Sequence, residues 1–171
     1  MARFFDTYRR TGSTVPRIQA MLYDTGQTFV NNALVYITGT GEVSECGANP
    51  ATVAGVALNG VGTQPGYDVA NSTQTLVYTG REARVSVAIA DSEQEFSARG
   101  VNGATDPVTP LQAHIGQQYG VLKVGSDWVI NIADQVNVVV QITDIALDAN
   151  KGGDDNSFFV CKFIPGVRQI P

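Results

Sequence analysis

The fold is decided by residues 119–144, which read YGVLKVGSDWVINIADQVNVVVQITD. Successive side chains of a strand point to opposite faces of the sheet, so a half-buried strand shows apolar residues at every second position. Polar residues mostly alternate with four apolar residues in the second half of this stretch, namely Val136, Val138, Val140 and Ile142. We therefore predict three successive strands joined by two tight turns, the first of them at Gly125 and Ser126.

Shorter apolar runs on either side of this stretch predict further strands, each bounded by Gly, Asn or Pro. In chain order they are an edge strand within residues 17–25, then residues 33–38, 42–46, 52–58, 74–79, 84–90, 96–99 and 157–164. The runs at 74–79 and 84–90 are predicted to pair with each other. Gly55 lies inside one run, which indicates a bulge or the close approach of another backbone.

The longest interruption of the strand pattern, residues 100–118, contains the one helical turn that we predict. Thr109 can cap this turn, Pro110 suits its first position and Gly116 can close it. A length of 171 residues is enough for one substantial core. The predicted fold is all-β: a single compact β-sandwich or barrel-like domain (residues 21–171) with one short helical turn and an extended N-terminal arm (residues 1–20).

Charge is distributed unevenly along the chain. The formal net charge is 11 − 16 = −5, but residues 1–20 carry four arginines against Asp6, so they are +3 and the remainder is −8. Phosphate binding needs a basic surface, so the acidic body argues against nucleic-acid and anionic-membrane partners. Because no apolar run is long enough to span a membrane or to form a secretory signal, we expect synthesis in the cytosol. Cys46 and Cys161 are expected to be reduced there.

The basic N-terminal arm has three interpretations, of which contact with nucleic acid ranks third. It can be a solvated, frayed terminus. Alternatively, it is a tether that becomes ordered against a neighbouring subunit, because aromatic residues and arginine anchor protein interfaces. A tether predicts that deletion of residues 1–12 leaves a folded domain with weakened attachment to its partner. The candidate partner-binding residues are Arg3, Phe4, Phe5, Tyr8, Arg9 and Arg10.

Residue types that carry catalysis or bind metals are sparse. His114 is the sole histidine and is interpreted as a surface or capping residue of the helical turn, so neither a catalytic triad nor a histidine metal site is expected. Residues 148–156 superficially resemble a calcium loop, but Phe159 stands where such a loop needs a bidentate glutamate, so a solvated hairpin loop is favoured. We predict no enzyme activity, no cofactor and no metal.

Two other groups of residues could suggest binding chemistry. Glu93 and Glu95 form a local pair of carboxylates and are interpreted as turn and surface charges. Trp128, Tyr119 and Tyr36 could form a sugar-stacking platform. Packing in the core or against a subunit is favoured for them, because Trp128 begins an alternating apolar run.

Four stretches together resemble the small β-rich capsid decoration, or cement, proteins of tailed bacteriophages. They are VAGVALNG at 53–60, QQYGVLKVGSDWVIN at 117–131, NVVVQITDI at 137–145 and FFVCKFIPGVRQ at 158–169. FIPGVRQ is the most distinctive piece. The arm and residues 100–118 have no counterpart in this resemblance.

The resemblance implies a protein that is not an enzyme and that binds the outer surface of an assembled icosahedral shell, bracing it against the pressure of the packaged DNA. The implied partners are the major capsid protein and further copies of the same chain, as a homo-oligomer and in particular a trimer. The implied location is the capsid surface of the virion, after synthesis in the host cytoplasm. Three alternatives stay open: a tail or head–tail joining component, a glycan- or host-surface-binding β module, and an enzyme.

Overall fold

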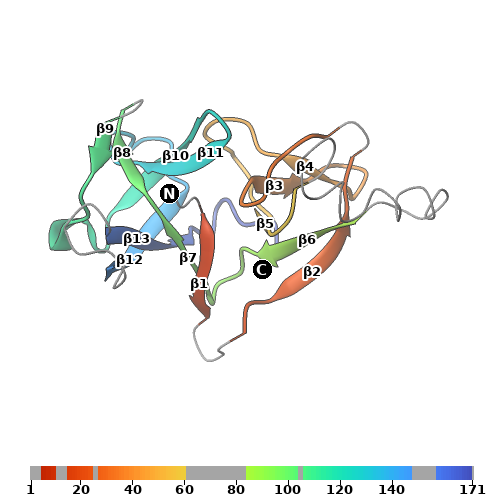
Figure 1. Ribbon diagram of the computed structural model, residues 1–171, viewed down its shortest axis with the longest axis horizontal. Coiled ribbons are helices and arrows are strands. Elements are labelled where there is room, and N and C mark those ends of the chain that lie inside the picture. Colours follow the sequence, from red (N-terminus) through yellow and green to blue (C-terminus); the bar gives the residue numbers. More distant parts are fainter. Residues whose placement is uncertain are drawn as a thin grey trace.

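The chain folds into two curled β-sheets that lie side by side (Figure 1). The computed structural model describes residues 5–10, 15–24, 27–60, 84–103, 106–147 and 157–170. Within these residues it contains thirteen strands and a single turn of 3-10 helix, so the all-β prediction with one short helical turn is confirmed.

The first sheet has eight strands and curls into a barrel-like shape. In spatial order the strands are β1 (Asp6–Arg10), β7 (Gln94–Ala98), β13 (Ser157–Phe163), β12 (Val140–Leu147), β10 (Gln118–Val124), β11 (Asp127–Asn131), β8 (Gly100–Asn102) and β9 (Asp106–Val108). Only Arg99 separates β7 from β8 along the chain, although four strands lie between them in the sheet. One continuous segment therefore borders both β13 and β11, and the sheet has to curl to allow this.

The passage from β7 to β8 depends on Gly100. A Cβ atom at this position would overlap the ring of Phe159, which belongs to β13. The carbonyl of Arg99 accepts a hydrogen bond from the amide of Ile130 on β11 at 2.9 Å, so the link stays paired. The predicted interruption is therefore wrong for residues 100–102 and 106–108, because glycine here permits close packing within a continuing sheet.

The second sheet has five strands, and its two ends meet. Asp24, just beyond the end of β2 (Ile18–Leu22), donates its amide hydrogen to the carbonyl of Val43 at 3.1 Å. A parallel bridge between Tyr23 and Val43 lies next to this bond. The close approach predicted at Gly55 is confirmed, because a Cβ atom there would overlap the carbonyl oxygen of Ala88. In spatial order the strands are β2 (Ile18–Leu22), β6 (Arg84–Ile89), β5 (Gly55–Ala57), β3 (Leu34–Ile37) and β4 (Val43–Glu45).

One hydrophobic core joins the two sheets. The C-terminal segment strengthens the junction, because it leaves the barrel-like sheet and returns to the five-stranded sheet. Val53 donates its amide hydrogen to the carbonyl of Val167 at 2.7 Å. The side-chain amide of Gln169 bonds both backbone groups of Ile37, at 2.6 and 2.9 Å. The largest completely buried side chains of the core are Trp128, Phe5, Phe29, Phe96 and Phe159.

The hairpin predicted within residues 119–144 is confirmed. The third strand predicted in this stretch exists but does not start at Val136 as the alternation suggested. β10 and β11 pair antiparallel, with only Gly125 and Ser126 between them. β12 begins at Val140 and pairs with β10, and Val136 is 88% exposed.

The late start of β12 has a local cause in Asp134. Its carboxylate accepts the amide hydrogens of Val136 and Asn137 at 3.1 and 2.9 Å, and this keeps the chain in a turn. The hydrogen bonds, that from Asn137 above all, lower the pKa of Asp134. The alternation of apolar residues therefore begins at Val136, four residues before the strand itself begins at Val140.

The helical turn η1 (Gln112–His114) lies where it was predicted, with a different cap. Leu111, not Thr109, precedes the turn, and its amide hydrogen is donated to Nδ1 of His114 at 3.0 Å. Gly116 closes the turn with a φ of 86°. The predicted strand at 74–79 and the loop at 148–156 lie outside the described residues.

Candidate interaction surface

The sole histidine and both cysteines are engaged in the packing of the fold. His114 caps the helical turn and packs edge-on against Phe159, with 5.3 Å between ring centroids. Both cysteines are free thiols in the interior. Burial, and secondly the charge of Glu45, raise the pKa of Cys46 to about 12, and burial also raises the pKa of Cys161. Across the described parts of the chain, no group of three His, Cys, Asp or Glu residues could hold a metal ion.

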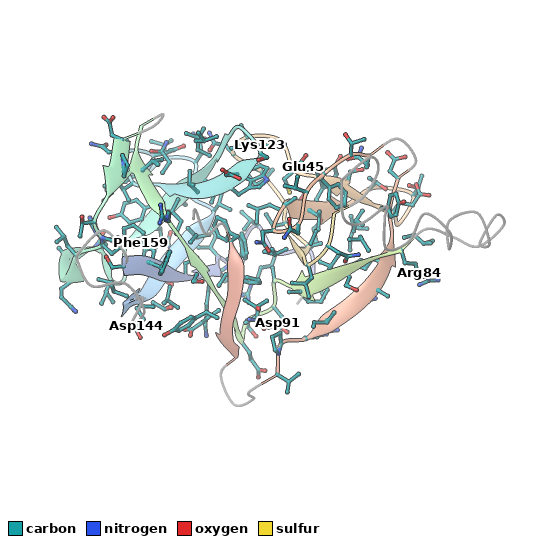
Figure 2. The ribbon with its side chains drawn as sticks, viewed as in Figure 1. Glu45, Arg84, Asp91, Lys123, Asp144 and Phe159 are labelled. Carbon is teal, nitrogen blue, oxygen red and sulfur yellow. The ribbon has the colours of Figure 1, made fainter. Side chains whose placement is uncertain are left out.

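The aromatic residues considered for sugar stacking belong mainly to the core. Trp128 is completely buried and Tyr119 nearly so, while Tyr36 is half-buried. The indole Nε1 of Trp128 donates to Oε1 of Glu45 at 3.3 Å, and the same oxygen lies 2.7 Å from Nζ of Lys123. These contacts hold the β10–β11 hairpin against the five-stranded sheet at the junction shown in Figure 2. The interpretation of Trp128 as a packing residue is confirmed.

Buried polar residues lie on β7 and just before it, next to the N-terminal strands. The interpretation of Glu93 and Glu95 as surface charges is wrong for Glu95, which is buried on β7, whereas Glu93 is exposed. Asp91 is also buried, and its Oδ1 accepts the amide hydrogens of Glu93 and Gln94 at 3.0 and 2.9 Å. Its Oδ2 lies 4.0 Å from Nη1 of Arg17, and Asp91 sits between β1 and β2 in Figure 2.

The start of the chain, predicted as an extended arm, contains an edge strand. β1 pairs antiparallel with β7, and its register shifts between Thr7 and Arg9. Phe5 is completely buried and stacks on Phe163, with 5.7 Å between ring centroids. A side chain in the core cannot contact a partner, so Phe5 anchors the strand instead of reaching out from it.

The other candidate residues of the arm fall into two groups. Tyr8 is 44% exposed on β1. Arg9 lies opposite Glu95 and Arg10 opposite Gln94 in the ladder with β7. Arg3 and Phe4, together with the side chains of Arg9 and Arg10, lie outside what the structure describes.

Exposed apolar side chains concentrate near the N-terminus. Of five large hydrophobic residues with high exposure in the described ranges, three belong to residues 8–18, at 44%, 66% and 52%. The guanidinium-bearing side chain of Arg17 is 48% exposed among them. We call these four residues the N-terminal surface: Tyr8, Val15, Arg17 and Ile18.

Sequence reasoning identified Tyr8 of this surface but not its other members. In β2 both alternating sets contain apolar residues, Ile18 and Leu22 in one and Met21 in the other, so the period alone does not say which set faces water. Burial of Met21 decides it. The nearest signal of exposure in the sequence is at Val15, an isolated apolar residue between Thr14 and Pro16.

Comparison of the chain with known protein families, with curated proteins and with solved structures finds no match. No helix within the described residues has the length and apolar character needed to cross a membrane.

Proposed function

We propose that this protein is a structural, non-enzymatic virion component that binds the outer surface of an assembled icosahedral capsid and stabilises it. The observation that carries the proposal is the N-terminal surface: three of the five highly exposed large hydrophobic residues of the described ranges fall within residues 8–18, together with an exposed arginine. Aromatic, aliphatic and arginine side chains of this kind form the centres of protein interfaces. The resemblance to decoration proteins names the partner, the major capsid protein, and the location, the capsid surface.

Stabilisation of the shell would follow from mass action. A protein that binds the assembled shell and not its free subunits lowers the free energy of the assembled state by its own binding free energy. Many copies on one shell act together, so each contact can be modest. Self-association, expected as a trimer from the resemblance, would add to this avidity.

Roles within residues 1–20 divide between anchoring and contact. Phe5 fixes β1 to the core, and β1 then presents Tyr8. Arg3, Phe4, Arg9 and Arg10 remain proposed contacts to the capsid, and their charge suits an acidic strip on it.

The test uses point variants, because deletion of residues 1–12 would also remove β1 and the buried Phe5. The double variant Tyr8→Ala/Val15→Ser should sediment with shells of the major capsid protein encoded in the same genome at least about tenfold less than the wild type, since each exposed apolar anchor contributes about 1–2 kcal/mol. The control is Leu111→Ser/Val136→Ser, which alters two exposed hydrophobic residues elsewhere, at 58% and 88%.

Two results would count against the proposal. Wild-type protein that does not sediment with intact shells removes capsid attachment altogether. Equal binding by the test and control variants keeps attachment but moves it away from the N-terminal surface. Electron microscopy of the same mixtures separates shell decoration from a head–tail joining role, which would place the protein at a single vertex.

A further inference from the structure

The four edge strands of the described sheets differ in how they are protected against pairing with another chain. Natural edges are blunted by charge, proline, bulges or short length. β1 has charged residues and a register shift, β9 is three residues long and contains Pro107, and β4 is three residues long and is bridged by Tyr23. β2, with the sequence IQAML, is five residues long, uncharged and regular in register.

The hydrogen bonds of β6 show which groups of β2 point outward. Arg17 uses its carbonyl to accept the amide hydrogen of Ile89, at 2.9 Å. Ser86, which lies opposite Ala20, uses both its backbone groups in hydrogen bonds to residues 58–59, on the side of β6 that faces away from β2. Because hydrogen-bonded and non-bonded pairs alternate in an antiparallel ladder, every second residue of β2, Ala20 included, turns its backbone groups to the outer edge.

Only the first half of this outer edge is open. At the far end, the bridge between Tyr23 and Val43 closes the sheet. Among the described residues, no strand pairs with the outer side of residues 16–20. Ile18 in the middle of this segment is 52% exposed, and Ala20 is exposed as well.

We propose that this half of β2 pairs with the same segment of a second copy of the chain, in an antiparallel two-fold ladder centred on Ile18. The two copies of Ile18 would exchange both backbone hydrogen bonds. Ala20 of each copy would donate its amide hydrogen to the carbonyl of Pro16 of the other copy. The same patch then serves both subunits, as a two-fold interface requires.

The backbone groups at the ends of this segment favour a second copy in this register. Pro16 has no N–H group, so in an ordinary ladder the carbonyl opposite it would stay without a donor. That carbonyl belongs to Ala20, and Nη1 of Arg84 already reaches it at 3.4 Å. The carbonyl of Ala20 is thus the one acceptor to which the second copy cannot donate, and Arg84 of the same chain donates to it instead.

Side chains add to this complementarity. Side chains of even-numbered residues in β2 lie on the face opposite to buried Met21, so the two exposed Ile18 side chains would meet on the outer face of the joined sheet. Pairing of the edge does not require capsid binding, so the inference stands apart from the proposed function, and it gives a two-fold dimer in place of the trimer that the resemblance implies.

Analytical ultracentrifugation of the full chain tests the ladder. Wild-type protein should show a monomer–dimer equilibrium. Ala20→Pro removes an outward N–H group while leaving the bonds between β2 and β6, and it should raise the dimer dissociation constant at least about tenfold, through the loss of two symmetry-related hydrogen bonds. Ile18→Lys should do the same by charge repulsion across the two-fold axis, whereas the control Val136→Lys should change it less than about twofold.

Circular dichroism and thermal unfolding should show that both variants are folded. If Ala20→Pro does not fold, Ile18→Lys alone tests the ladder, because it changes only an exposed side chain. A wild-type chain that stays monomeric up to about 1 mM overturns the inference, since such an interface would be weaker than about −4 kcal/mol. A dimer unaffected by both substitutions also overturns it, as does an assembly of three copies.

Discussion

The two edge strands at the N-terminus, β1 and β2, follow one another in a single basic stretch and have opposite attachments. β1 is fixed by Phe5, whose ring lies on Phe163 in the core, and its ladder to β7 includes the buried Glu95. β2 buries Met21 and leaves Ile18 half exposed. One basic stretch of the chain therefore combines a buried anchor with an exposed surface.

The largest expected effect is on the anchor. Phe5→Ala removes a completely buried ring and should lower the free energy of unfolding by about 3–5 kcal/mol. Tyr8→Ala, three residues further along the chain and within β1, should cost less than about 1 kcal/mol because the side chain is 44% exposed. Urea denaturation followed by tryptophan fluorescence measures both. Similar losses for the two variants would show that β1 is not held by Phe5.

The two cysteines locate where Phe5→Ala opens the molecule. Cys161 lies on β13, beside β7, whereas Cys46 follows β4 in the other sheet. Only the thiolate reacts, and the raised pKa of both groups keeps them protonated at pH 8, so labelling requires local opening. A local loss of about 3 kcal/mol should speed labelling of Cys161 roughly a hundredfold, with a smaller change at Cys46. Mass spectrometry of labelled peptides resolves the two, and equal acceleration would mean that the sheets open together.

Asp91 tests the junction between the strands. Asp91→Ala leaves the amide hydrogens of Glu93 and Gln94 without their acceptor, and should cost about 1–3 kcal/mol. Asp91→Asn keeps an acceptor oxygen and loses only the charge, so its loss should be smaller. Thermal unfolding of the pair separates hydrogen bonding from charge. An equal loss in both variants would assign the effect to the contact with Arg17.

The strands themselves could largely be predicted from local pattern, because alternation and glycine turns are properties of short segments. The β10–β11 hairpin follows from apolar alternation on both sides of Gly125 and Ser126. Two predictions failed for different reasons. β12 starts late because of local hydrogen bonds to Asp134, which apolar alternation does not reveal. The interruption predicted to begin at Gly100 is wrong because of a partner far away in the chain, the ring of Phe159.

The candidate surface was harder to predict than the fold, for a related reason. Phe5 and Ile18 are both apolar residues within the basic stretch of residues 1–20, and nothing local distinguishes the buried one from the exposed one. The distinction comes from pairing across long separations, β1 with β7 and β2 with β6. The sequence therefore located the relevant stretch but not the division within it.

The smallest expected effect is on β2, where Arg17→Ala should lower the free energy of unfolding by less than about 1 kcal/mol. Nη1 of Arg17 lies 4.0 Å from the carboxylate of Asp91 and the side chain is 48% exposed, so water and salt screen the pair. The matched control is Arg84→Ala, an exposed arginine on β6 that lies opposite Leu22 of β2. If β2 serves as a surface, Arg17→Ala should weaken attachment to capsid shells while unfolding in urea barely changes. A loss of stability as large as that of Asp91→Ala would instead make Arg17 a structural link, and β2 an anchored strand like β1.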